Sequence, residues 1–395
     1  MTIAEVAAST GSVGDQRELQ DRLLRQVDAV ADVIAAGTEY ANRERQLAPE
    51  VVQALADAHL FSMLAPARHG GLGANAQTAS AVVEAVARRC GSAAWVTMIT
   101  NGGNFYASRF PQQAQEDVYG PNPGARLASV TSLASTFTET EGGYIVNGRW
   151  PFSSGIMHDD WAVLGNAEFQ AILPIGDVTI EKTWETVGLR GTGSHTTVVE
   201  DVFVPSHRVA TFKKVMGYDA CTDPGLPAEL RLPIVETSAL LLGSVIVGIG
   251  QHGCQLVSEL GRKRPIMMTP YEKAADSQAF QASLGECIMR VESGRLHLAE
   301  VARTLDAAAA KAEMLSDEQL VRTRAGVAHG TRLVTLAIDE LMNLAGSSSY
   351  ATASPLAQVW RDAHTGASHA VLSARVNYEW VGLAAVNPDF QVFKP

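Results

Sequence analysis

The sequence predicts an α+β chain with a helical N-terminal domain, a middle domain of short β-strands and a C-terminal bundle of long helices. Its 395 residues are enough for two or three domains of roughly 150 residues each. Helical periodicity dominates the first third, short strand-like runs with turn residues follow, and long helical patterns then return. These changes put the domains at residues 1–124, 125–232 and 233–395.

The N-terminal domain is expected to be helical because apolar residues recur there at spacings of three and four. The first such face consists of Leu19, Leu23, Val27, Val30 and Ile34. Pro49 suits the first turn of a second helix that ends near His59. The glycine-rich stretch 66–73 predicts a loop, and residues 78–89 and 93–105 predict two more helices.

The middle domain is expected to be a small antiparallel β domain. Glu141, Gly142 and Gly143 form a turn that joins two of its strands as a hairpin. The predicted strands are residues 126–130, 135–140, 144–150, 161–165, 169–173 and 196–204.

Four long helices are expected in the C-terminal domain. They cover residues 236–262, 276–312, 317–345 and 355–383, and the run Gly346-Ser347-Ser348-Ser349 separates the last two. Helices of this length bury one another as an antiparallel bundle.

Composition excludes several functional classes. The chain has 31 basic and 42 acidic residues and no basic block, so neither nucleic acid nor a membrane surface is expected as a partner. The longest apolar run, Ala239–Gly250, is too short to span a bilayer, and the start of the chain lacks a signal-peptide pattern, so we expect a cytoplasmic protein. Four scattered cysteines without a CxxC pair predict neither structural zinc nor disulfides.

Familiar catalytic motifs are absent from the sequence. It has no GxGxxG after a strand, no P-loop, no GxSxG elbow and no Glu-x-x-His pair in the bundle. His158, Asp159 and Asp160 could suggest a metal site, but three adjacent side chains point in different directions. We therefore expect no metal, and a loop that caps the next strand.

Two stretches carry residues suited to chemistry. Trp150-Pro151-Phe152-Ser153-Ser154 places aromatics and hydroxyls at a strand end, where they could flank a flat ring and bond its polar edge, or simply pack as a barrel rim. His364 and His369 are expected on one helix, about 140° apart, and serve either in proton handling or in packing.

The order of domains and four local matches together resemble the acyl-CoA dehydrogenase fold over nearly the whole chain. The matches are Leu64–Gly73, Gly142–Gly155, Val187–Pro205 and Leu344–His369. The resemblance implies three domains: N-terminal helices, a middle β-barrel domain and a C-terminal four-helix bundle.

Departures from true acyl-CoA dehydrogenases point to a different reaction. The family's TEPxxGSD motif has no counterpart, and His369 and Ala370 stand where the family commonly has its catalytic glutamate. The alternative position for that base is roughly Ser238, although Glu236 lies close by. These departures are similar to the flavin-dependent monooxygenases of this fold, which act on phenols, indoles, thiophenes and amino sugars.

The resemblance therefore implies hydroxylation of an indole- or phenol-type aromatic by O2 and reduced flavin through a C4a-hydroperoxide. FADH2 or FMNH2 would come from a separate NAD(P)H-dependent flavin reductase. His369 would act as general base, and Ser154 would donate a hydrogen bond that holds the flavin intermediate. The alternatives are an acyl-CoA dehydrogenase-type enzyme, an N- or S-oxygenase, and a flavin-binding protein without catalysis.

The resemblance also implies binding residues and an assembly. The substrate pocket would include Asn101, Asn104 and Phe105, with His364 as a rival for the base. In a homotetramer, one subunit's Gly346–Ser348 segment would approach a flavin held by another subunit. Arg262 or Arg264 would pair with a phosphate group of that flavin. The implied flavin-binding residues are Ser129, Thr131, Trp150, Phe152, Ser153, Arg262, Arg264, Gly346, Ser347, Ser348 and His364.

Overall fold

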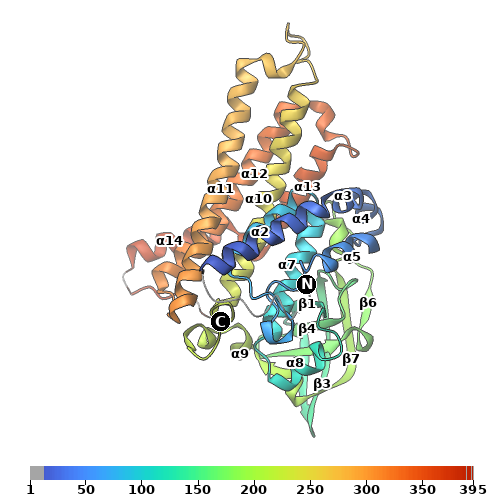
Figure 1. Cartoon of the computed structure of the whole chain (residues 1–395), viewed down its shortest axis with the longest axis vertical. Helices are drawn as coiled ribbons and strands as arrows, with labels where there is room; N and C mark the ends of the chain where they lie inside the picture. The colour runs from blue at the N-terminus through green and yellow to red at the C-terminus, as the bar shows by residue number, and fades with distance from the viewer. Residues whose placement is uncertain (1–12, 388, 393, 395) are drawn as a thin grey trace.

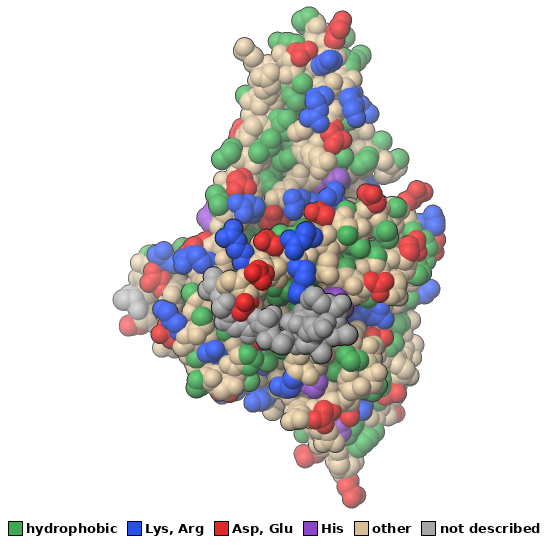
Figure 2. Space-filling view, viewed as in Figure 1, with side chains coloured by type: hydrophobic (Ala, Val, Ile, Leu, Met, Phe, Trp, Pro, Cys, Tyr) green, Lys and Arg blue, Asp and Glu red, His purple; other side chains and the backbone are tan. Residues whose placement is uncertain are grey.

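A computed structural model of the chain describes residues 13–387, 389–392 and 394. It confirms the three-part architecture: N-terminal helices lie between a β domain and a helical bundle that extends away from it (Figure 1). The first residues, on which the expectation of no signal peptide depends, lie outside the described part. Basic and acidic side chains are interspersed on the face shown in Figure 2.

The N-terminal domain contains the expected helices and several shorter ones. Pro49 begins a helix, as its position predicts, and the helix expected from residue 93 begins at Gly91. A short helix after residue 111 was not expected. The helices are α2 (Val13–Ala29), α3 (Ala31–Ala36), α4 (Thr38–Glu44), α5 (Pro49–Asp57), α6 (Ala76–Ala87), α7 (Gly91–Ala107) and α8 (Gln112–Tyr119).

The β domain consists of two four-stranded sheets with the orders β1-β4-β5-β8 and β2-β3-β7-β6. The β2–β3 hairpin is confirmed, with Thr140 paired to Gly143. The expectation of a purely antiparallel domain is wrong for one pair, since β1 and β4 are parallel. The hairpin between them belongs to the other sheet, so the chain returns by a crossover. The strands are β1 (Leu127–Thr131), β2 (Ser135–Thr140), β3 (Gly143–Ser153), β4 (Trp161–Gly165), β5 (Phe169–Pro174), β6 (Thr179–Glu181), β7 (His195–Pro205) and β8 (Val209–Thr211).

The bundle corrects one expected helix. The segment predicted as a single helix over 355–383 is divided by a break after Ala367 that contains a short 3-10 turn, η9 (Ala370–Leu372). His369 therefore precedes η9 and shares no helix with His364, Asp362 or Thr365. The helices after the β domain are α9 (Phe212–Met216), α10 (Ile234–Gly261), α11 (Gln278–Lys311), α12 (Asp317–Ala345), α13 (Pro355–Ala367) and α14 (Ala374–Val386).

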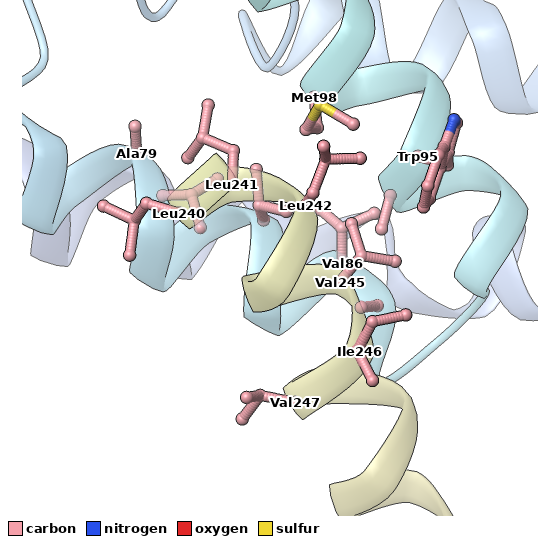
Figure 3. Close-up of a cluster of buried hydrophobic side chains, with 14 of the residues drawn as sticks. Ala79, Val86, Trp95, Met98, Leu240, Leu241, Leu242, Val245, Ile246 and Val247 are labelled. Atoms are coloured by element: carbon pink, nitrogen blue, oxygen red, sulfur yellow. The ribbon is translucent and has the colours of Figure 1, made fainter. Parts of the chain in front are cut away.

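Helix α10 is the centre of the core. It is long and apolar enough to cross a membrane, yet 83% of its most apolar window is buried inside the protein, as in a core helix. One face of the helix, with Leu242 and Val245, lies against α6 and α7 (Figure 3), whereas Gly243 faces α11 and α12. On the other side of α7, a Cβ at Gly103 would lie 2.0 Å from the Leu127 carbonyl oxygen, so glycine lets α7 rest directly on β1. Helix α7 thus touches both other domains.

Candidate active site

Trp95 on α7 is the residue around which the three domains meet. Its indole nitrogen donates a hydrogen bond to the Ser154 hydroxyl at 3.2 Å, and its ring centroid lies 6.2 Å from that of His369. The ring is 6% exposed and sits at the edge of the apolar cluster in Figure 3. The two residues expected to be catalytic therefore flank one tryptophan that sequence reasoning missed, although it lies in the apolar helix predicted there.

Ser154 heads a row of buried hydroxyls in the β domain. Its Oγ lies 2.7 Å from the Ser194 Oγ, which in turn lies 2.7 Å from the Thr192 Oγ1. The Thr192 hydroxyl donates to the Leu189 carbonyl oxygen at 2.8 Å. Ser194 and Thr192 belong to the glycine-punctuated stretch before β7, whose sequence indicated only a loop.

The same loop is anchored to the bundle. The Leu189 amide donates to the buried Asp362 carboxylate on α13 at 2.6 Å, and burial raises the pKa of Asp362 to about 6. A Cβ at Gly366 would lie 2.9 Å from the Trp95 ring and 3.2 Å from Leu189. The absence of a side chain at Gly366 therefore allows α13 to pack directly against both residues.

His369 is held at the surface of the chain beside Trp95. Its backbone is extended (φ −59°, ψ 137°), and its carbonyl accepts the Leu372 amide. Although the residue is exposed, the protein beside the ring displaces part of its water, and this desolvation lowers the pKa of His369 below its usual 6.5. The imidazole is therefore neutral at neutral pH and can accept a proton.

His364 lies on the opposite face of α13. It is two residues from both Asp362 and Gly366, which face Leu189 and Trp95, and two helical residues are separated by about 200°. Its Nε2 lies 2.9 Å from the Asp339 carboxylate on α12, and its ring packs at 4.7 Å from Trp360. Of the two histidines, only His369 is next to Trp95.

The structure corrects the expected substrate pocket at Asn101, Asn104 and Phe105. The Asn101 amide donates to two backbone carbonyls, those of Leu60 and Thr97, and its oxygen accepts the Leu64 amide. Asn104 is bonded to the Phe61 carbonyl and the Tyr119 hydroxyl, and Phe105 is 1% exposed. These side chains are buried and bonded within the N-terminal domain, so they do not line a pocket.

The opposite face of α7 is the open one. Trp95, Ile99, Gly102 and Tyr106 follow one another at spacings of four, three and four, which puts them on a single helical face. A Cβ built at Gly102 meets no atom within 4 Å, whereas Ile99 reaches within 3.8 Å of a Cβ at Gly155. The Tyr106 hydroxyl interacts with Ser238 on α10. Free space therefore lies beside the face that carries Trp95.

The expected flavin residues of β3 separate into two groups. Phe152 is 69% exposed and meets Trp184 edge to face at a centroid distance of 6.1 Å. In contrast, Trp150 and Ser153 are fully buried and bonded internally, to the Gly165 and Trp150 carbonyls. This corrects the expectation that the side chains of Trp150 and Ser153 contact flavin, since neither side chain is accessible.

The remaining expected flavin residues lie at two separate places. Ser129 and Thr131 lie on β1, half-buried and exposed respectively. Arg262 and Arg264 follow α10, and Gly346–Ser348 follows α12, at the end of the bundle away from the β domain (Figure 1). There the Arg264 guanidinium donates to the Ser348 hydroxyl at 3.1 Å. Within one chain, the residues on β1 and those at this end of the bundle are therefore separate from one another.

Glu236, the glutamate close to the alternative base position near Ser238, is engaged in other contacts. Glu236 is fully buried, and its carboxylate accepts hydrogen bonds from Arg324 at 2.8 Å and from the Tyr218 hydroxyl at 2.9 Å. An ion-paired, buried glutamate is not free to abstract a substrate proton. This geometry argues against the acyl-CoA dehydrogenase alternative.

The three residues considered as a metal cluster have separate structural partners. His158 accepts the Leu47 amide at 2.9 Å, Asp159 accepts the Thr100 hydroxyl at 3.1 Å, and Asp160 accepts the Arg126 amide at 3.0 Å. Within the described residues, no group of three or more His, Cys, Asp or Glu could hold a metal ion.

Comparison with known proteins identifies the class. Residues 14–122 match the N-terminal domain of acyl-CoA dehydrogenases and residues 240–374 match their C-terminal domain. The structure of XiaF from Streptomyces sp., in complex with FADH2 and glycerol, superposes with a TM-score of 0.92 at 37% identity, covering 96% of this chain and 99% of that one.

Two curated relatives define the reaction type. The oxygenase subunit HsaA of a flavin-dependent monooxygenase from Rhodococcus jostii (strain RHA1) is 31% identical over 360 residues, 88% of this chain and 94% of that protein. The oxygenase component of an FADH2-dependent resorcinol hydroxylase from Rhizobium sp. (strain MTP-10005) is 27% identical over 385 residues, 91% of this chain and 92% of that protein.

The chain belongs to the flavin-dependent monooxygenases of the acyl-CoA dehydrogenase fold. Within that family it is the oxygenase component of a two-component system, which uses reduced flavin to hydroxylate aromatic substrates.

Proposed function

We propose that the chain hydroxylates an indole- or phenol-type substrate lying against the open face of α7, with His369 as general base and Ser154 as a flavin contact. The observation that carries this proposal is the placement of Trp95 between Ser154 and His369. A substrate beside Trp95 would be within reach of both residues. The resorcinol hydroxylase among the relatives supports a phenol-type substrate.

The residues around Ser154 fit a flavin. Phe152 exposes an aromatic surface two residues before Ser154, and the buried hydroxyl row ends on Ser154 itself. An apolar surface beside a polar edge matches the isoalloxazine ring. Bound reduced flavin would supply the electrons and carry the activated oxygen. Trp95 and the bundle would keep water from that oxygen, and His369 would take the proton from the substrate.

The partners of the proposed enzyme follow from this role. A separate NAD(P)H-dependent flavin reductase would supply FADH2 or FMNH2 in the cytoplasm. We also propose a homotetramer in which the Arg264–Ser348 end of one bundle approaches the flavin site of another subunit. The separation of these residues from Phe152 within one chain supports it. Sedimentation of the purified protein tests this assembly, and an active monomer would contradict it.

The experiment is a single-turnover assay in which purified protein with chemically reduced flavin is mixed with oxygen and a panel of phenols and indoles. Hydroxylated product should contain one atom of ¹⁸O from labelled O2. His369→Ala should reduce hydroxylation by about 10²–10⁴-fold while oxygen is still consumed and released as hydrogen peroxide. In the parent protein, the rate should decline on acidification only below pH 6.5, because the pKa of His369 is lowered.

His364→Ala is the matched control, since it removes a histidine from the other face of α13. It should hydroxylate at close to the parental rate. If His364→Ala loses hydroxylation and His369→Ala does not, the base is assigned to the wrong histidine. Bleaching of bound oxidised flavin by an acyl-CoA would instead support the dehydrogenase alternative.

A further inference from the structure

The hydroxyl row beneath Trp95 has only one arrangement of its protons. Three contacts join four oxygens in order: Ser154 to Ser194, Ser194 to Thr192, and Thr192 to the Leu189 carbonyl. Each contact needs one proton, and the carbonyl has none to give. The three hydroxyls supply three protons, so each donates once, towards Leu189.

The order fixes the role of Ser154. Its own proton points at Ser194, and one of its lone pairs accepts the Trp95 N–H at 3.2 Å. What remains of its hydrogen-bonding capacity is a second lone pair. Ser154 is 8% exposed, so a ligand can still reach this lone pair. Because the Ser154 proton is already used, Ser154 can meet that ligand only as an acceptor. This differs from the expectation that Ser154 donates to the flavin intermediate.

The far end of the row is firmly held. The Leu189 carbonyl also accepts the indole N–H of Trp184 at 3.0 Å, while the Leu189 amide donates to Asp362 at 2.6 Å. Thr192 and Ser194 are 0% and 3% exposed. No water is needed to complete the row, so its direction does not depend on solvent.

We propose that this ordered row makes the site select the oxidation state of flavin. The proposal rests on the proposed contact between Ser154 and flavin, and it takes N5 as the flavin atom that Ser154 meets. Reduced flavin carries a hydrogen on N5 and can donate to Ser154, whereas the N5 of oxidised flavin can only accept. Two acceptors facing each other repel, so oxidised flavin is disfavoured. Thr192 and Ser194 are positioning residues that act through Ser154.

The test measures binding of reduced and oxidised FAD to the full chain under anaerobic conditions, before any turnover. Thr192→Val keeps the shape of the side chain but removes the hydroxyl, which frees Ser194 to donate to Ser154 and Ser154 to donate to flavin. The ratio of the oxidised to the reduced dissociation constant should shrink by about three- to tenfold, the size of one neutral hydrogen bond. Ser194→Ala should shrink it similarly.

Two variants separate the hydroxyl effect from general damage. Thr192→Ser keeps a hydroxyl and should retain the parental ratio. Thr183→Val removes a hydroxyl of a different pair, Thr183 with Thr196 at 2.8 Å, and should also retain it. The proposal is overturned if Thr192→Val leaves the ratio unchanged, or if Thr192→Ser changes it equally. A parent chain that binds neither flavin form would overturn the proposed function itself, and this proposal with it.

Discussion

Asp362→Asn should stabilise the protein at neutral pH. Burial raises the pKa of this carboxyl from 3.8 to about 6, so the folded chain binds the proton more tightly than the unfolded chain. Ionisation therefore costs folding free energy. The cost is absent below about pH 3.8, grows as the pH rises to about 6, and is then constant. The interval from 3.8 to about 6, at about 1.36 kcal/mol per pKa unit, sets an upper limit of about 3 kcal/mol.

Asparagine keeps the acceptor for the Leu189 amide but carries no charge, so the variant avoids this cost. Urea unfolding of both proteins should show a gap of up to about 3 kcal/mol at pH 8 that closes towards pH 4. Glu318→Gln is the control, because its exposed pair with Arg322 contributes less than about 1 kcal/mol. A gap that is the same at both pH values would refute the reasoning.

Two further substitutions test the two faces of α7. Gly102→Leu fills the open space and should raise KM at least about tenfold for polycyclic substrates, while Gly285→Leu, at an equally open position on α11, should not. Steady-state KM values for single-ring and polycyclic substrates measure the effect. An equal rise in KM for single-ring phenols would contradict the prediction. Asn101→Ala leaves the Leu64 amide unpaired and should cost about 2–3 kcal/mol of stability, seen as a lower melting temperature. Hydroxylation by the molecules that remain folded should be unchanged, and a catalytic loss without destabilisation would restore Asn101 to the substrate site.

Much of the fold could be predicted because its elements have strong periodic signals. Helix α12 ends where the apolar pattern ends, and the turn at Gly142 identifies the β2–β3 hairpin. The break before His369 gives no such signal, since residues 368–373 contain neither proline nor glycine. The break follows Gly366, where the absence of a side chain allows close packing against Trp95. This is a tertiary contact, and the periodicity of the sequence does not reveal it.

The site was only partly predictable for a related reason. Ser154 and His369 carry recognisable chemistry and match a family pattern, and the structure brings both to Trp95. Asn101 carries the same kind of polar signal, but its partners are backbone groups of a distant loop. A polar residue on an apolar helix has the same pattern whether it anchors a loop or faces a substrate, and only the fold distinguishes the two.

The two faces of α7 differ in how freely their residues can change during evolution. Asn101 and Asn104 hold the helix to its own domain, while Ile99 and Gly102 border the open side and the Tyr106 hydroxyl on the same face interacts with Ser238 on α10. A lineage could therefore exchange the residues of the open side, and with them its range of substrates, while leaving the anchoring amides untouched. Directed evolution towards new aromatic substrates should begin with those three positions.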